Sequence, residues 1–149
     1  MAKETERKFL VKTTDYRDIA NEKHNIKQGY LSTRKEATVR VRIKNQSAFV
    51  TIKGISNGAT RDEWEYSIPE SDAAEMLKLS QGVIIEKTRY IVEYEGYVWE
   101  VDEFHGVHQG LIIAEIELTD EKETFPKPPF VGEEVTGNVA YYNSTLARV

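Results

Sequence analysis

The sequence predicts a mainly β (α+β) fold: an eight-stranded antiparallel closed barrel, a tunnel with a polar interior and helices packed outside. Eight segments have strand character, and several of them alternate charged with apolar residues. Short turn signals separate some of these segments, among them Glu95-Gly96, which is typical of a tight hairpin. Helices are few, and closing the sheet into a barrel would remove its exposed edges.

The predicted strands are runs of β-branched, aromatic and alternating residues, with turn signals at 44–47, 56–58 and 95–96. In chain order they are Glu4–Val11, Ile26–Ser32, Ala37–Lys44, Ala48–Gly54, Arg61–Ile68, Ile84–Tyr94, Tyr97–Phe104 and Leu111–Leu118. The predicted helices are Asp15–Lys23, Asp72–Leu79, a short one after Thr119, and one from about Val139 to the C-terminus. Asp72 and Glu75 have the spacing of a capping box, and Asn138 is placed to cap the last helix.

Composition bounds the class of protein. A chain of 149 residues suits one domain, 1–149, and is long enough to bury a core. Cysteine is absent, which excludes disulfides and thiolate metal sites, and no apolar run has the length of a membrane span. The first residues lack the apolar stretch of a signal peptide, so we expect a cytoplasmic protein. The net charge of −5 argues against a general nucleic-acid binder, although it allows a local basic cavity.

Like charges share faces of the predicted strands, because side chains alternate along an extended chain. Arg40, Arg42 and Lys44 share one face, and Glu4 and Glu6 share another. Half-exposed strands with a solvated charged face are common, and for any single strand that is the favoured interpretation. The grouping of like charges on single strand faces favours the other interpretation, in which the charged faces line an interior. Rows of like charge repel each other, and a ligand or metal is the usual compensation, so the charged faces are predicted to point inward.

The predicted interior is neutral before any ligand enters. Its eight cations are Lys8, Arg40, Arg42, Lys44, Lys53, Arg61, Lys87 and Arg89. Its eight carboxylates are Glu4, Glu6, Glu63, Glu65, Glu100, Asp102, Glu115 and Glu117. Two divalent cations would add four positive charges, which is about what a triphosphate requires.

A series of ordered motifs resembles a known family. The motifs are Glu4-x-Glu6-x-Lys8, Gln28-Gly29-Tyr30-Leu31-Ser32, Val39-Arg40-Val41-Arg42, Thr51-Ile52-Lys53-Gly54, Arg61-Asp62-Glu63-Trp64-Glu65, Glu86-Lys87-Thr88-Arg89-Tyr90, Glu100-Val101-Asp102, Glu115-Ile116-Glu117, Gly132-Glu133-Glu134-Val135-Thr136 and Tyr141-Tyr142-Asn143. Over nearly its whole length the chain resembles CYTH-domain proteins of the triphosphate tunnel metalloenzyme superfamily, in particular the short bacterial single-domain type. It departs from them at Val139-Ala140, where relatives often carry basic residues.

The resemblance implies roles for named residues. The implied metal ligands are Glu4, Glu6, Glu115 and Glu117, with Asp102 helping a second ion; these residues and Lys8 form the implied catalytic set. The implied substrate-binding residues are Lys8, Arg40, Arg42, Lys53, Arg61, Lys87 and Arg89, with Tyr30 as a further contact. Oxygen ligands suit Mg²⁺ or Mn²⁺, here two ions, and arginine binds phosphate bidentately.

The resemblance implies a metal-dependent hydrolase that converts inorganic triphosphate to pyrophosphate and phosphate. A hydrolase or cyclase acting on nucleoside or thiamine triphosphate is an alternative, and so is a non-catalytic polyphosphate or nucleotide sensor. The partner is expected to be a small-molecule triphosphate, without nucleic acid or membrane, and a homodimer is possible. His105 and His108 are spaced like metal ligands but lack a third partner, so a structural or solvent role is expected for them.

Overall fold

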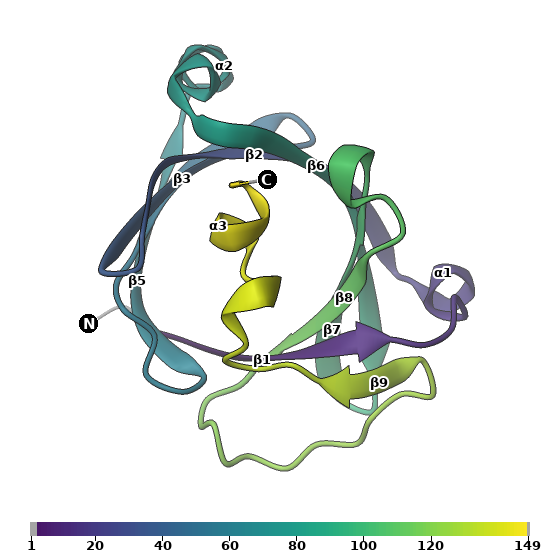
Figure 1. Ribbon diagram of the computed structural model, residues 1–149. Coiled ribbons are helices and arrows are strands. Elements are labelled where there is room, and N and C mark those ends of the chain that lie inside the picture. Colours follow the sequence, from purple (N-terminus) through teal and green to yellow (C-terminus); the bar gives the residue numbers. More distant parts are fainter. Residues whose placement is uncertain (1–2, 149) are drawn as a thin grey trace.

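The computed structural model describes residues 3–148 as a closed barrel of eight antiparallel strands, as predicted. The strands are β1 (Lys3–Val11), β2 (Glu22–Arg34), β3 (Ala37–Lys44), β4 (Ser47–Lys53), β5 (Thr60–Ile68), β6 (Gln81–Tyr94), β7 (Tyr97–Phe104), β8 (Ile112–Glu117) and β9 (Val131–Glu134). Around the barrel the order is β5-β4-β3-β2-β6-β7-β8-β1, and pairing of β1 with β5 closes it (Figure 1). No helix in the range 3–148 has the length and apolar composition needed to cross a lipid bilayer.

Strand β9, which the sequence analysis did not predict, completes the edge of β1. The first residues of β1 pair with β5 through Lys3, Glu4 and Thr5. Further along, β1 leaves β5, and the same strand pairs with β9 at Phe9 and Val11. The β9 strand therefore satisfies backbone groups that closure of the barrel leaves unpaired.

The helices are shorter than predicted. They are α1 (Tyr16–Ile19), α2 (Glu70–Met76), α3 (Asn143–Leu146) and the 3-10 turns η1 (Leu77–Leu79), η2 (Gly106–His108) and η3 (Val139–Tyr141). The prediction of a helix through Lys23 was wrong, because Glu22 and Lys23 pair with Ile91 and Tyr90 of β6. The helix predicted after Thr119 is a turn and an irregular segment instead.

Capping also differs from the prediction at one helix and agrees at another. Helix α2 begins at Glu70, so Asp72 lies inside the helix and Pro69 occupies the cap position, where its fixed φ suits the extended backbone. At η3 the predicted cap is confirmed: the side chain of Asn138 accepts a hydrogen bond from the Ala140 N–H at 3.1 Å.

The apolar faces of the strands point out of the barrel and are covered there. Phe9, Trp99 and Ile116 are fully buried on the outer side, where they pack with Tyr16 of α1 and with Phe130 just before β9. A second apolar cluster joins α2 to β3 and β4. The hydrophobic stabilisation of the fold therefore lies mostly outside the sheet, which leaves the interior for charged side chains.

One end of the barrel is covered by the C-terminal segment, which runs across the opening in the end-on view of Figure 1. Leu146 of α3 is buried against Tyr30, Ile85 and Ile113, and the Val83 N–H donates to the Ala147 carbonyl at 2.7 Å. Towards the other end, Glu65 and Glu100 keep side-chain exposures of 44% and 39%. The barrel is therefore covered at one end and accessible to solvent at the other.

Candidate active site

The barrel encloses a charged cavity of about 190 Å³. All eight predicted interior cations and seven of the eight predicted carboxylates line it, and the exception is Asp102. The lining residues are Glu4, Glu6, Lys8, Tyr30, Arg40, Arg42, Lys44, Lys53, Arg61, Glu63, Glu65, Lys87, Arg89, Glu100, Glu115, Glu117 and Asn143. Alternation along the strands thus places the two signs of charge inside one enclosed space.

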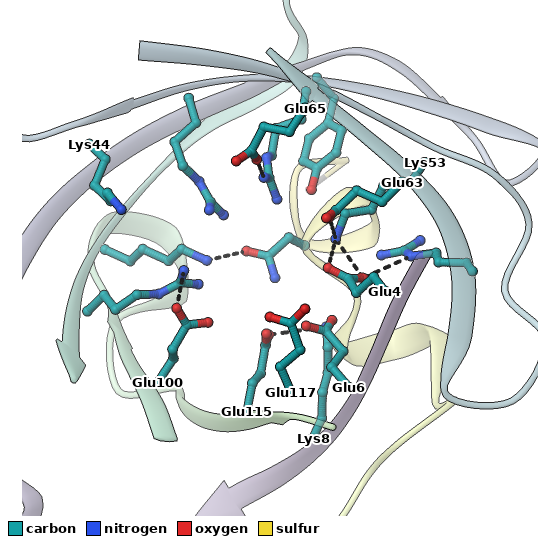
Figure 2. Close-up of a pocket in the computed structure, with 17 residues that line it drawn as sticks. Glu4, Glu6, Lys8, Lys44, Lys53, Glu63, Glu65, Glu100, Glu115 and Glu117 are labelled. Atoms are coloured by element: carbon teal, nitrogen blue, oxygen red, sulfur yellow. Dashed lines mark hydrogen bonds and ion pairs between the residues drawn. The ribbon is translucent and has the colours of Figure 1, made fainter. Parts of the chain in front are cut away.

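We call β1 and β8, with the four glutamates Glu4, Glu6, Glu115 and Glu117, the acidic wall; Figure 2 shows these side chains along one side of the cavity. The strands pair so that Glu6 lies opposite Glu117 and Lys8 opposite Glu115. The Lys8 ammonium is 3.6 Å from the Glu115 carboxylate. Burial by itself would raise the pKa of Glu115, but Lys8 next to it holds that pKa below its usual range.

Glu6 is the least compensated carboxylate of the acidic wall. Burial, with Glu115 and Glu4 close by, raises the pKa of Glu6 to about 8. The pKa of Glu117 is raised for the same reasons: burial first, then the charges of Glu4 and Glu100. Repulsion among these carboxylates, together with their burial, exceeds the attraction of the neighbouring cations. The wall therefore favours a bound proton or a bound cation.

Glu4 is the best compensated carboxylate of the wall. Lys53 donates to both of its oxygens at 2.9 Å, and Arg61 Nε lies 3.6 Å from it. Lys53 also contacts Glu63 at 3.3 Å. Burial alone would raise the pKa of Glu4, but Lys53 outweighs it and the pKa is lowered. Burial and the adjacent Glu4 raise the pKa of Glu63 to about 7.

The basic wall comprises Arg40, Arg42 and Lys44 of β3 with Lys87 and Arg89 of β6. The strand order places β2, with β3 and β6 beside it, across the barrel from β1 and β8. Arg40 contacts Thr51 at 3.1 Å and Glu65 at 3.5 Å, but its buried Nε has no hydrogen-bond partner among the residues that the structure describes. An unpartnered buried donor on a side chain that lines a charged cavity fits an anionic ligand.

Arg42 lacks a carboxylate partner within 4.0 Å, again among residues 3–148. Its Nε donates to Gln28 Oε1 at 2.7 Å, and Gln28 is a neutral acceptor. Burial, together with the neighbouring Arg40 and Arg89, lowers the pKa of Arg42 to about 9. The protein therefore buries this guanidinium next to like charges and without a carboxylate of the described chain in direct contact.

Asp102 lies behind the cavity and holds the two cations of β6. Arg89 donates to both of its oxygens, at 2.8 and 2.9 Å, and Lys87 Nζ is 2.7 Å away. Although burial alone would raise it, these two cations hold the pKa of Asp102 far below its usual range. The structure thus places Asp102 beside the lining and not within it, while Glu100 of the same strand reaches the cavity.

The chemistry of the acidic wall fits a divalent cation, although the side chains do not already form a cage. Within residues 3–148, no three acidic or histidine side chains converge tightly enough to hold a metal ion as they lie. Their oxygens are nevertheless the ligand type that Mg²⁺ and Mn²⁺ prefer. The raised pKa values of Glu6 and Glu117 show that a positive charge there would relieve repulsion.

Two uncharged residues of the site were not identified from the sequence. Asn143 enters the lining from α3, and Gln28, which is fully buried, supports it from β2. Both residues lie in motifs that carry the family resemblance, and Gln28 shares a strand face with Tyr30, but neither signal assigned them a role. His105 and His108, for which a structural or solvent role was expected, are not among the lining residues: His105 contacts the Thr88 hydroxyl, and His108 contacts the Leu146 carbonyl.

Comparison with known proteins gives consistent results. The model of the CYTH domain family matches residues 2–147. The chain is 46% identical over 149 residues to a protein of Acetivibrio thermocellus named inorganic triphosphatase, covering 99% of this chain and 95% of that protein. It is 34% identical over 148 residues to an inorganic triphosphatase of Nitrosomonas europaea, covering 97% and 96%.

A solved structure agrees with this fold over nearly the whole length. The crystal structure of an inorganic triphosphatase superimposes with a TM-score of 0.69 at 31% sequence identity and covers 97% of both chains. The similarity therefore extends over the barrel and the C-terminal segment together.

Proposed function

The chain belongs to the CYTH domain family, and from this we propose that it hydrolyses inorganic triphosphate to pyrophosphate and phosphate inside the barrel. The observation that carries the proposal is the pair of oppositely charged walls around one enclosed cavity. Two relatives, 46% and 34% identical, that are named inorganic triphosphatases support it. The small cavity of about 190 Å³ favours a compact anion without an attached base.

We propose that phosphate is bound by the cations that line the cavity of the barrel, which we call the lumen. In the described residues, Arg40 has a donor without a hydrogen-bond partner, and Arg42 has no carboxylate in contact; we propose that both bind phosphate oxygens, as arginine does in a bidentate geometry. Lys8, Lys53, Arg61, Lys87 and Arg89 line the same cavity and complete the proposed binding set, with Tyr30 as a further contact. Positive charge in an enclosed site also stabilises charge that develops on the leaving pyrophosphate.

The proposed metal ligands are the four glutamates of the acidic wall, which would hold Mg²⁺ or Mn²⁺, in all two ions. When bound, such ions neutralise phosphate charge and lower the pKa of a bound water. Asp102 would have to release Arg89 and Lys87 to reach an ion, so we assign it the role of holding those two cations in the lumen.

Water is the proposed nucleophile. The cavity lining described above contains no histidine, serine or threonine. The oxygen of water would bond to the terminal phosphorus while the bridging P–O bond breaks and pyrophosphate leaves. The lumen would exclude bulk water and hold the phosphates in line for this displacement.

The test is phosphate release with Mg²⁺ or Mn²⁺ from inorganic triphosphate, ATP and thiamine triphosphate in parallel. We expect inorganic triphosphate to have the highest kcat/KM. A preference for ATP or thiamine triphosphate would replace the proposed substrate within the same site. Binding of triphosphate without any release of phosphate would identify a sensor and overturn the proposed activity.

A further inference from the structure

Four side chains at the covered end of the lumen form one hydrogen-bonded chain. Lys87 Nζ donates to Asn143 Oδ1 at 2.9 Å. Gln28 Nε2 donates to the same oxygen, also at 2.9 Å, and Arg42 Nε donates to Gln28 Oε1 at 2.7 Å. Two neutral amides thus connect a cation of β6 with a cation of β3.

The direction of every bond in this chain is fixed by the two cations. Lysine and arginine can only donate, so the oxygens of Asn143 and Gln28 must face them. Gln28 then presents its NH₂ group to Asn143, which is the arrangement observed. Each amide therefore has one possible orientation, and Gln28 is fully buried.

The partners on the two sides of the basic wall differ in charge. Arg89 is held by a carboxylate, Asp102, through two hydrogen bonds. Arg42 is held by the neutral Gln28, and within residues 3–148 no carboxylate lies within 4.0 Å of its guanidinium. Because Gln28 occupies only the Nε of Arg42, the terminal nitrogens remain available on the cavity side. A neutral acceptor fixes the direction of the guanidinium without cancelling its charge.

The C-terminal segment delivers the second amide. Asn143 is the first residue of α3, and this segment is anchored by Leu146 in the apolar cluster and by the Ala147 carbonyl. The ring of Tyr142 lies under two further lumen cations, with Lys8 Nζ at 5.4 Å and the Arg61 guanidinium at 5.7 Å from its centre. Although this chain has Val139-Ala140 where relatives often carry basic residues, its C-terminal segment contacts the cations that line the lumen.

We infer that Gln28 and Asn143 are positioning residues: the neutral Gln28 orients Arg42 towards a phosphorylated ligand while leaving its charge available, and Asn143 holds Gln28 and Lys87 in place. This inference rests on the proposed function, since it assigns a role in binding the proposed substrate. Neither residue contacts the reacting atoms in this scheme. Their effect is to hold donors in one direction before the ligand arrives, which reduces the ordering that binding requires.

The discriminating variant is Gln28→Glu, which preserves shape and still accepts from Arg42 but adds a countercharge. We expect the KM for triphosphate to rise about tenfold or more, because a charge-assisted contact to phosphate is replaced by an internal ion pair. The change in kcat should be smaller than the change in KM, and the variant also loses the hydrogen bond that Gln28 Nε2 donates to Asn143.

Gln109→Glu is the matched control, since it makes the same chemical change on an exposed loop outside the lumen. It should leave KM unchanged. A merely structural role for Gln28 predicts a lower melting temperature with an unaltered KM, and that result would overturn the inference. So would an equal rise of KM in Gln109→Glu, since net charge alone would then explain the effect.

Calorimetric titration of wild type and Gln28→Glu with tripolyphosphate in the presence of a chelator separates this inference from the proposed activity. Weaker binding by the variant supports the inference even if wild type releases no phosphate, in which case only the proposed hydrolysis fails. Equal binding by the two proteins, together with normal hydrolysis by wild type, leaves the activity intact and rejects the role of Gln28.

Discussion

The acidic and basic walls of the lumen are built in the same way, from alternate residues of neighbouring strands, yet they differ in how the protein compensates them. On the acidic wall, Glu6 pairs in register with Glu117, so carboxylate lies opposite carboxylate. On the basic wall, the single carboxylate of Asp102 behind the cavity contacts both Lys87 and Arg89, and the neutral Gln28 orients Arg42. Repulsion between carboxylates therefore remains on the acidic wall, and on the basic wall Arg42 remains without a carboxylate in contact among the described residues.

This difference shows what each wall lacks. A positive charge close to Glu6 and Glu117 would relieve the acidic wall, because burial and the neighbouring carboxylates raise the pKa values of both residues. The basic wall is relieved by an anion at Arg40 and Arg42, because in the described chain the buried Nε of Arg40 lacks a hydrogen-bond partner and Arg42 contacts no carboxylate. A metal-bound phosphate chain would satisfy both at once, which is why the comparison supports the proposed function.

The largest effect is expected for Glu115→Gln, which tests the proposed metal binding by the acidic wall. The amide oxygen can still contact Lys8, but it offers a cation no charge, so we expect kcat to fall by about 100-fold or more. The circular dichroism spectrum and much of the thermal stability should be retained. Glu133→Gln, on exposed β9, is the control and should retain full activity. Unchanged turnover in Glu115→Gln would remove this residue from the metal site.

Arg40→Ala tests the basic wall. The variant loses contacts to phosphate oxygens that are worth more than a neutral hydrogen bond, so the KM for triphosphate should rise about 10- to 100-fold. Arg34→Ala removes the same side chain from an exposed position, where 77% of it is accessible, and should leave KM as it is. An unaltered KM in Arg40→Ala would place this arginine out of reach of the substrate.

The sequence predicted the barrel and most of the lumen because both depend on a local pattern. In β3 the period of two separates Arg40, Arg42 and Lys44 from the apolar residues between them, the same alternation recurs in β8, and β1 and β6 also place like charges at alternate positions. Sign segregation then indicated which face points inward. Such information is carried by each strand alone, so it survives without knowledge of the rest of the fold.

What the sequence did not predict depends on long-range contacts or on uncharged residues. The helical pattern through Lys23 is overridden by pairing with β6, and Asn143 reaches the lumen only because the C-terminal segment folds back across the barrel end. Gln28 carries no charge that could signal a role. Asp102 shares its strand face with Glu100 but is drawn behind the lining by Arg89 and Lys87, which alternation alone cannot reveal.

The smallest expected effect concerns the repulsion left on the acidic wall, and it is measured without metal, in the presence of a chelator. The pKa of Glu117 is raised by burial and then by Glu4 and Glu100. A group with a raised folded-state pKa contributes stability that is fully present below its unfolded pKa, about 4.3, and is lost as the pH rises through the folded value. Ionised Glu117 should therefore destabilise the metal-free barrel at neutral pH and not near pH 4.

Glu117→Gln cannot ionise, so at pH 7.5 it should melt about 1–2 °C above wild type, in line with about 0.5 kcal/mol for a like-charge cross-strand pair. The two proteins should melt together near pH 4, and adding Mn²⁺ at pH 7.5 should stabilise wild type more than the variant. Glu86→Gln, an exposed glutamate on β6, should show neither trend. If Glu117→Gln instead lowered the melting temperature at pH 7.5, the carboxylate would already be compensated inside the protein, and the contrast between the two walls would not hold.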